Sequence, residues 1–92
     1  MIRSFKHRGL KRLYERGDAS GIRPDVLERV KRILMVLDSA ASPEAVDLPG
    51  WRLHPLKGDL KGFWSVTVRA NWRVIFRFDA SDVIDVELVD YH

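Results

Sequence analysis

The hydrophobic pattern changes from helical to alternating near the middle of the chain. In residues 7–16, apolar positions recur at helical spacing and basic residues fill the outer face. A longer apolar stripe, about four turns in length, follows in residues 26–41. Beyond Pro49-Gly50 the period becomes two, which is typical of strands. The stripe of the longer helix comprises Val26, Val30, Ile33, Leu34, Leu37 and Ala41.

Turn and capping residues predict where these elements begin and end. Gly17 supplies a stop for the first helix, while Pro24 suits the first turn of the second and Asp25 favours its positive end. Residues 42–47, which begin Ser-Pro-Glu, predict one further helical turn. Residues 2–5 are expected to form an opening strand if later strands pair with them.

The alternation also predicts the register of a hairpin. A three-residue loop at 69–71 pairs Val66 with Val74 and Val68 with Trp72, so the apolar sets of both strands face one side, and it places Asn71 in a left-handed conformation. The opposite face is then expected to be polar, partly cationic and free to bind, with Thr67 opposite Arg73. It carries Phe63, Ser65, Thr67, Arg73, Ile75 and Arg77.

The last strand completes an α+β domain that spans residues 1–92. Ile84, Val86 and Leu88 are expected to face the core, and Arg77 to pair with Asp85 or Glu87. A strand, two helices with a helical turn, and a mainly antiparallel sheet follow one another, so the helices cover one sheet face. Trp64 and Trp72 have core parity, and Trp51 is expected to be half-buried; none is assigned a function.

Composition limits the classes of protein that fit. With 46% hydrophobic and 32% charged residues, 92 residues suit one compact domain. The absence of cysteine excludes disulfides and thiolate zinc sites, and no run of residues has the length of a signal peptide or a membrane span. We therefore expect a cytoplasmic protein without membrane contacts. The net charge of +3 matters only if it is concentrated on one face.

Candidate chemistry is confined to proton transfer and charge stabilisation. No phosphate-binding glycine loop or nucleophile elbow is present, and His7, His54 and His92 are far apart without an acidic cluster, so neither a metal nor another cofactor is expected. His, Tyr, Arg and Lys side chains suffice for cleavage of RNA by attack of its own 2′-hydroxyl on the adjacent phosphate. His54 and His92 are the acid and base candidates because imidazole titrates near neutral pH.

Each candidate taken alone also has a simpler structural interpretation, and the residues alone favour it. His54 can end a strand, and Asp90, Tyr91 and His92 can be a polar tail. Arg73 and Lys57 can be ordinary surface charges. Their coincidence near one group of strand ends is what raises the hypothesis of an enzyme.

At these residues the chain resembles the HigB toxins of the RelE/ParE superfamily, which belong to type II toxin–antitoxin systems. The resemblance covers essentially the whole chain. It rests on residues 2–5 with Gly9-Leu10-Lys11, on Leu53-His54-Pro55-Leu56-Lys57-Gly58, on the hairpin from Trp64 to Arg73, and on the terminal Asp90-Tyr91-His92. The hairpin and the terminal triplet are specific only together.

The resemblance implies a microbial-RNase-like fold and a ribosome-dependent, metal-independent endoribonuclease that cuts messenger RNA in the ribosomal A site and so inhibits translation. Carried over by position, His54 and His92 share proton transfer, Tyr91 and Asp90 orient or assist it, and Arg73 and Lys57 hold the scissile phosphate. Which residue is the base and which the acid stays open. The basic residues expected to contact RNA are Arg8, Lys11, Arg12, Lys61 and Arg69.

The resemblance also implies partners: the 70S ribosome with its messenger RNA, and a HigA-like helix-turn-helix antitoxin through which the pair contacts operator DNA. Two other functions fit the same residues. A ParE-like DNA gyrase poison shares the fold but does not need the acid–base set at His54 and Tyr91-His92. A non-catalytic RNA- or protein-binding module would keep its function after His92→Ala.

Overall fold

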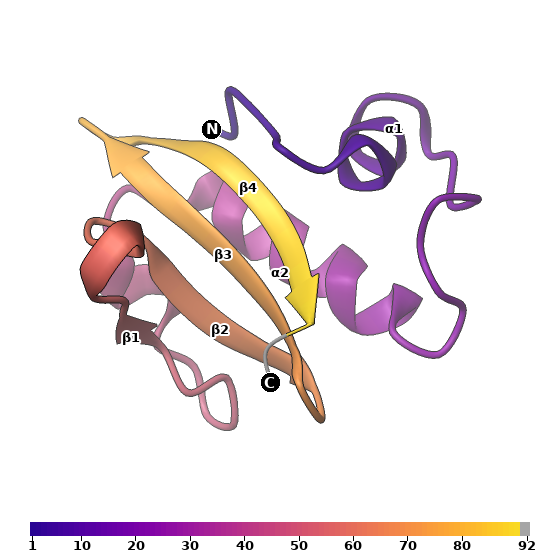
Figure 1. The fold of residues 1–92 in the computed structure, drawn as a ribbon. Coiled ribbons are helices and arrows are strands. Elements are labelled where there is room, and N and C mark those ends of the chain that lie inside the picture. Colours follow the sequence, from indigo (N-terminus) through magenta and orange to yellow (C-terminus); the bar gives the residue numbers. More distant parts are fainter. Residues whose placement is uncertain (91–92) are drawn as a thin grey trace.

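The computed structural model describes residues 1–90. Two helices, α1 (Arg8–Arg16) and α2 (Leu27–Ser39), precede a four-stranded antiparallel sheet. The strands β1 (His54–Pro55), β2 (Trp64–Arg69), β3 (Trp72–Asp79) and β4 (Asp82–Asp90) are neighbours in chain order. In Figure 1, α2 crosses behind the sheet, and α1 lies beyond the β4 edge. The predicted α+β architecture, with helices on one sheet face, is confirmed.

The N-terminal segment lies along the free edge of β4 as two parallel bridges. Ile2 pairs with Val83 and Phe5 with Val86, so the continuous strand predicted for residues 2–5 is wrong in extent although its place beside the sheet is right. Between the bridges β4 departs from regular geometry, because Asp85 has a φ of 54° and its amide donates to Ser4 Oγ at 2.9 Å. The interruption at Asp85 breaks the regular ladder of backbone hydrogen bonds, so residues 2–5 form two isolated bridges instead of a strand.

The first helix begins and ends at capping residues, whereas the second begins later than predicted. His7 caps α1, since its Nδ1 accepts from the Leu10 amide at 3.1 Å, and Gly17 ends the helix at a φ of 69°. The second helix begins at Leu27, later than Pro24 and Asp25 predict, because residues 24–26 form a turn instead. The helical turn expected after Ser42 is the short 3₁₀ helix η1 (Pro43–Val46).

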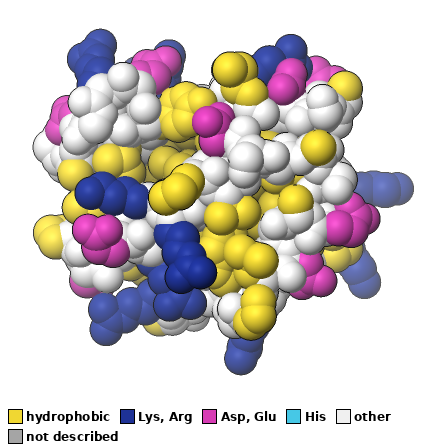
Figure 2. Space-filling model, turned by 180° about the vertical axis from the view of Figure 1, so that it is seen from behind, with side chains coloured by type: hydrophobic (Ala, Val, Ile, Leu, Met, Phe, Trp, Pro, Cys, Tyr) yellow, Lys and Arg dark blue, Asp and Glu magenta, His cyan; other side chains and the backbone are white. Residues whose placement is uncertain are grey.

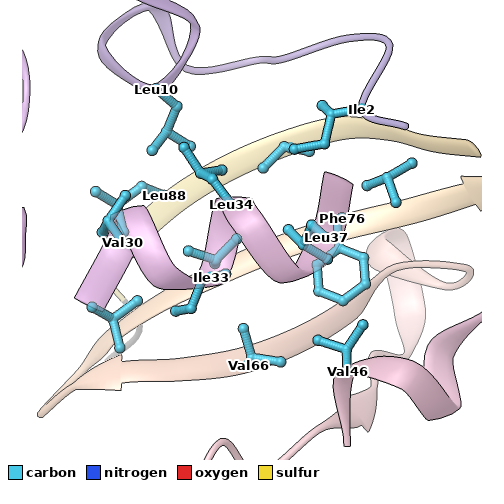
Figure 3. Packing of buried hydrophobic residues seen from close by; sticks show 14 of the residues in the cluster. Ile2, Leu10, Val30, Ile33, Leu34, Leu37, Val46, Val66, Phe76 and Leu88 are labelled. Atoms are coloured by element: carbon cyan, nitrogen blue, oxygen red, sulfur yellow. The ribbon is translucent and has the colours of Figure 1, made fainter. Parts of the chain in front are cut away.

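The core lies between α2 and the sheet. Val30, Ile33 and Leu37 on α2 face Val66 and Phe76, all of them buried (Figure 3). Burial of such a side chain stabilises the fold by about 1.5–3 kcal/mol, so this stripe is the main reason α2 stays on the sheet. The last position of the predicted stripe is wrong: the chain leaves the helix at Ala40, which is buried, while Ala41 is exposed.

The hairpin register is right in its body and wrong at its tip. Val66 pairs with Val74 and Thr67 with Arg73, as predicted. A bulge at Val68 then pairs Arg69 with Trp72 and leaves a two-residue turn, in which Ala70 takes the positive φ, 50°, expected of Asn71. The three-residue loop was predicted in order to keep Val68 on the core side. The bulge inserts one extra residue into β2 and achieves the same burial of Val68 with a two-residue turn.

A second bulge changes the core side of β4. The shift between Ile75 and Arg77 puts Val83 and Val86 in the core, and Ile84, which was predicted to be there, is only partly buried. Trp51 also differs from expectation, because it is buried rather than half-buried; its carbonyl accepts from the Thr67 amide at 2.7 Å. Trp64 and Trp72 pack against the core as predicted.

Candidate active site

The sheet face opposite the helices carries the predicted polar row. Directly paired residues of antiparallel strands project to the same face. Thr67 of β2 pairs with Arg73 of β3, which pairs with Val89 of β4, and His54 of β1 pairs with Ser65 of β2. The register therefore places His54, Thr67 and Arg73 on one face, within neighbouring rows of three strands.

Part of this face is covered by hydrophobic side chains, which corrects the expectation of a polar face that is free to bind. Leu56, Phe63 and Ile75 are buried there as a second hydrophobic cluster, with Leu60 and Val89 packed beside them. The loop between β1 and β2, which contains the 3₁₀ helix η2 (Gly58–Leu60), folds over the sheet and is closed by a bond from the Leu56 amide to the Phe63 carbonyl at 2.9 Å. The cluster fixes the segment that carries Lys57.

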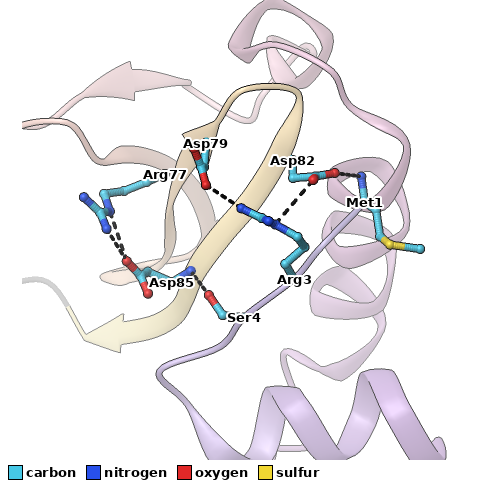
Figure 4. Close-up of polar contacts among 7 residues, drawn as sticks. All are labelled: Met1, Arg3, Ser4, Arg77, Asp79, Asp82 and Asp85. Atoms are coloured by element: carbon cyan, nitrogen blue, oxygen red, sulfur yellow. Dashed lines mark hydrogen bonds and ion pairs between the residues drawn. The ribbon is translucent and has the colours of Figure 1, made fainter.

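Two cations border this cluster. Lys6 Nζ lies 5.4 Å and Arg77 Cζ 5.3 Å from the centre of the Phe63 ring, within cation–π range. Arg77 is held by Asp85, whose Oδ2 accepts from Nε at 3.0 Å and from Nη2 at 2.6 Å (Figure 4). Of the two partners predicted for Arg77, the structure selects Asp85. Sequence reasoning missed Lys6, because nothing in its local pattern shows that the N-terminal segment reaches this face.

His54 is exposed, and one of its ring nitrogens is already engaged. Nδ1 lies 3.0 Å from the Arg52 carbonyl oxygen, which can only accept, so Nδ1 carries a proton. In the neutral ring the lone pair is then on Nε2. An exposed imidazole with a fixed tautomer and a free Nε2 has the properties of a general base.

Arg73 is half-buried and folded toward the turn of the hairpin. Its Nη1 donates to the carbonyls of Ala70 at 2.6 Å and Trp72 at 3.1 Å. Two carbonyls satisfy one nitrogen and leave the other guanidinium donors for an anion. The turn thus positions the cation at the end of the face where β4 finishes.

The other predicted catalytic residues are less closely placed. Lys57 is exposed at the start of η2. Asp90 ends β4 in register with Trp72, so it projects to the side opposite Arg73, and it takes part in an interaction of its own. Tyr91 and His92 lie outside the described residues. The register therefore places His54 on β1 and Arg73 on β3 on one sheet face, with β2 between them, and the grouping of the full set stays a prediction.

The predicted RNA-binding residues occupy three separate places. Arg8 and Lys11 are exposed on α1 and border a shallow groove of about 240 Å³. Arg12 differs, because it is half-buried with Nε 3.7 Å from Asp18 Oδ2 and supports the connection between the helices. Lys61 follows η2, and Arg69 lies at the hairpin tip with Nη1 3.7 Å from Asp25 Oδ2.

Residues 1–90 contain neither a set of metal ligands nor a membrane-spanning helix. Among these residues, no three His, Asp or Glu side chains come together as a set that could bind a metal ion. In the same part of the chain, no helix is both long and apolar enough to cross a membrane.

Solved structures share this fold over nearly the whole chain. YafQ from E. coli strain BL21(DE3) superposes with a TM-score of 0.66 at 15% identity, covering 98% of this chain and 91% of that one. The YoeB–YefM complex from Staphylococcus aureus gives a TM-score of 0.63 at 14% identity, covering 100% of this chain and 98% of the matched one. At such low identity the likeness establishes the fold alone.

Sequence comparison is more specific. The family model of the RelE-like toxin of the type II toxin–antitoxin system HigB matches residues 3–92. The Endoribonuclease HigB of Proteus vulgaris is 45% identical over 92 residues, all of both chains. This chain belongs to the HigB-like family of RelE-like toxins, as its sequence predicted.

Proposed function

We propose that this toxin is a ribosome-dependent endoribonuclease that cuts messenger RNA in the ribosomal A site. The observation that carries the proposal is the exposed His54 with a free Nε2 on the same sheet face as the Arg73 guanidinium. The relative that matches at 45% over both full lengths is named an endoribonuclease, which supports the same activity here. The toxin would act in the cytoplasm, where translation takes place.

The proposed reaction is attack of a ribose 2′-hydroxyl on the adjacent phosphate. One group removes the hydroxyl proton and another protonates the leaving 5′-oxygen, while cations stabilise the charge that develops on the phosphorane. His54 and His92 would carry the protons, Arg73 and Lys57 would hold the phosphate, and Tyr91 and Asp90 would orient or assist the proton transfer. These groups suffice without a metal ion.

Recognition of the ribosome is assigned to the basic residues around this face. Four of them are exposed and can neutralise ribosomal RNA phosphates: Arg8, Lys11, Lys61 and Arg69. Arg12 would contribute indirectly, because its ion pair with Asp18 supports the connection that follows the first helix. A family of type II toxins implies an antitoxin, and a structural neighbour is itself a toxin-fold protein in complex with YefM. We propose a HigA-like antitoxin, with operator DNA bound only through that complex.

The test is cleavage of a defined messenger in a programmed 70S complex by the intact chain, Arg73→Ala and His92→Ala. A loss of turnover of about 10²–10⁴-fold with ribosome binding retained would support the assignment. Arg29→Ala removes an exposed cation on α2, away from this sheet face, and is the matched control that should cleave normally. Intact messenger with folded wild-type protein would overturn the proposal, and gyrase-mediated DNA cleavage would be measured next.

A further inference from the structure

The outward side of α2 combines exposed cations with an exposed methionine. Met35 is 70% exposed, and with Met1 it is one of two large hydrophobic residues exposed among residues 1–90. Because α2 lies behind the sheet in Figure 1, its outward side faces the viewer in Figure 2, where basic side chains lie next to hydrophobic ones. A single exposed methionine is common on protein surfaces, and this one becomes informative because it borders a groove.

Met35 borders a groove of about 300 Å³ between α1 and α2. Leu13 and Leu34 line it, so its interior is largely apolar. At its polar end Tyr14 donates to Asp38 Oδ1 at 2.6 Å, and the Ile2 amide donates to the same oxygen at 3.0 Å. The hydrogen bonds of Asp38 are thus made within the fold. A partner that enters the groove would contact its apolar part and the nearby Lys31.

A second groove, of about 340 Å³, follows the other side of α2. Arg29 and Arg32, one turn apart, form one wall, and Leu48, Pro49 and Trp51 form the other. Within residues 1–90, the side chain of neither arginine makes a hydrogen bond or an ion pair. A third cation of α2, Lys31, borders the first groove and is held only loosely, with Nζ 3.9 Å from Glu28 Oε1.

We propose that this surface, Arg29, Lys31, Arg32 and Met35 with the two grooves beside them, is where the antitoxin docks. The inference rests on the proposed toxin–antitoxin partnership. The occupant fitted by the surface is a segment with an apolar side chain for the groove beside Met35 and carboxylates for the unpaired arginines. Methionine adapts to irregular apolar partners, and guanidinium groups bind carboxylates bidentately.

The chemistry of the grooves favours a protein over RNA. A phosphate backbone would use the cations and leave the exposed Met35 without an apolar partner. An acidic and apolar peptide uses both kinds of side chain, and the positive surface would also speed its association. The proposed docking surface belongs to the helix layer, whereas His54 and Arg73 project from the opposite sheet face.

The experiment measures the affinity of the co-expressed cognate antitoxin for the intact chain and for two variants, Met35→Glu and Arg32→Glu. Each variant should weaken binding by at least about tenfold, or about 1.4 kcal/mol. Ser81→Glu and Lys11→Glu introduce the same groups at exposed positions elsewhere and should bind as the wild type does. Met35→Leu, which keeps the apolar contact, should also retain affinity. Thermal midpoints and ribosomal cleavage should be unchanged in Met35→Glu and Arg32→Glu.

Three results would overturn the inference. Wild-type affinity in both variants would place the antitoxin elsewhere. Normal antitoxin affinity with salt-sensitive loss of ribosome binding would assign the surface to RNA. Equal weakening by the two control substitutions would show a general charge effect rather than a site. Failure of the partnership itself is distinguished because then the wild-type chain would not bind the antitoxin at all.

Discussion

Gly9 and Gly21 allow α1 to lie in backbone contact with the loop that leaves it. A Cβ on Gly9 would be 2.6 Å from the Gly21 carbonyl oxygen, and a Cβ on Gly21 would be 2.7 Å from Gly9 Cα. Both approaches are to backbone atoms, which cannot rotate away. The requirement is for the absence of a side chain rather than for a special backbone conformation, because neither glycine has a positive φ.

Gly9→Ala is expected to destabilise the fold. Overpacking costs about 1–3 kcal/mol, which exceeds the gain of up to about 1 kcal/mol from the better helix propensity of alanine. Urea unfolding should show a lower midpoint with an unchanged m-value. Ser81→Ala, at an exposed turn position, is the control. An unchanged midpoint for Gly9→Ala would mean that the loop moves away at no cost.

Asp38 links α2 to two other segments, and its titration should be visible in stability. The Tyr14 hydroxyl and the Ile2 amide both donate to it, which lowers the pKa of the carboxyl group, and the same bond raises the pKa of Tyr14 to about 12. The contribution of Asp38 is complete above its unfolded pKa and is lost as pH falls through the lower folded value. That of Tyr14 is lost as pH rises from 10 through about 12.

Asp38→Asn should therefore reduce the loss of stability below about pH 4, and Tyr14→Phe should reduce the loss above pH 10. Both variants should be less stable than the wild type at pH 7. The free energy of unfolding, measured by urea at each pH, provides the check. Parallel curves for the wild type and both variants would show that the pair does not contribute through its charge state.

At the scale of elements, the start of α1 depends on an unprotonated histidine. His7 Nδ1 accepts from the Leu10 amide, and burial is the main cause that lowers the pKa of the ring; Arg12 lowers it further and Glu87 opposes both. The unfolded chain therefore binds a proton before the folded one does. Stability is complete above pH 6.5 and falls as pH decreases toward the folded pKa.

His7→Asn keeps a capping acceptor and removes the titration. Between pH 7.5 and 5.5 the wild type should lose stability and this variant should lose less. His7→Ala lacks the capping acceptor and should be about 1 kcal/mol less stable than the wild type at pH 7.5. That difference should shrink at pH 5.5, because the wild-type ring gains a proton and can no longer accept from the Leu10 amide. Chemical unfolding at both pH values gives the three differences. If the asparagine variant follows the wild type, other groups cause the acid sensitivity.

Hydrophobic periodicity predicted the helices, the sheet and the central hairpin register because each depends on a repeating pattern. It failed where one residue interrupts the pattern: the bulges at Val68 and near Asp85 insert a residue, and a positive φ at Ala70 or Asp85 leaves no mark in the sequence. In the same way, the register that places Thr67 beside Arg73 was predictable, whereas the bonds of Arg73 to the hairpin carbonyls were not.

At the scale of the whole molecule, a net charge of +3 is too small to explain binding to RNA, so the distribution of charge must. Some basic side chains are already neutralised by ion pairs within the chain: Arg3 pairs with Asp79 and Asp82, and Arg77 pairs with Asp85. The first helix has the opposite character, since Arg8 and Lys11 stand exposed on its outer side. The proposed ribosome contacts should be concentrated there.

Lys11→Ala should therefore change the salt dependence of ribosome binding more than it changes the rate of messenger cleavage. Loss of one phosphate contact should reduce the slope of log K against log salt by about 0.7–0.9, because one fewer counterion is released. Cleavage by the bound toxin should be unaffected, in contrast to Arg73→Ala. Arg3→Ala removes a cation that is already paired and should leave the slope unchanged. Equal slopes for Lys11→Ala and the wild type would show that the first helix faces solvent in the ribosome complex. The phosphate contacts would then have to come from Lys61 and Arg69.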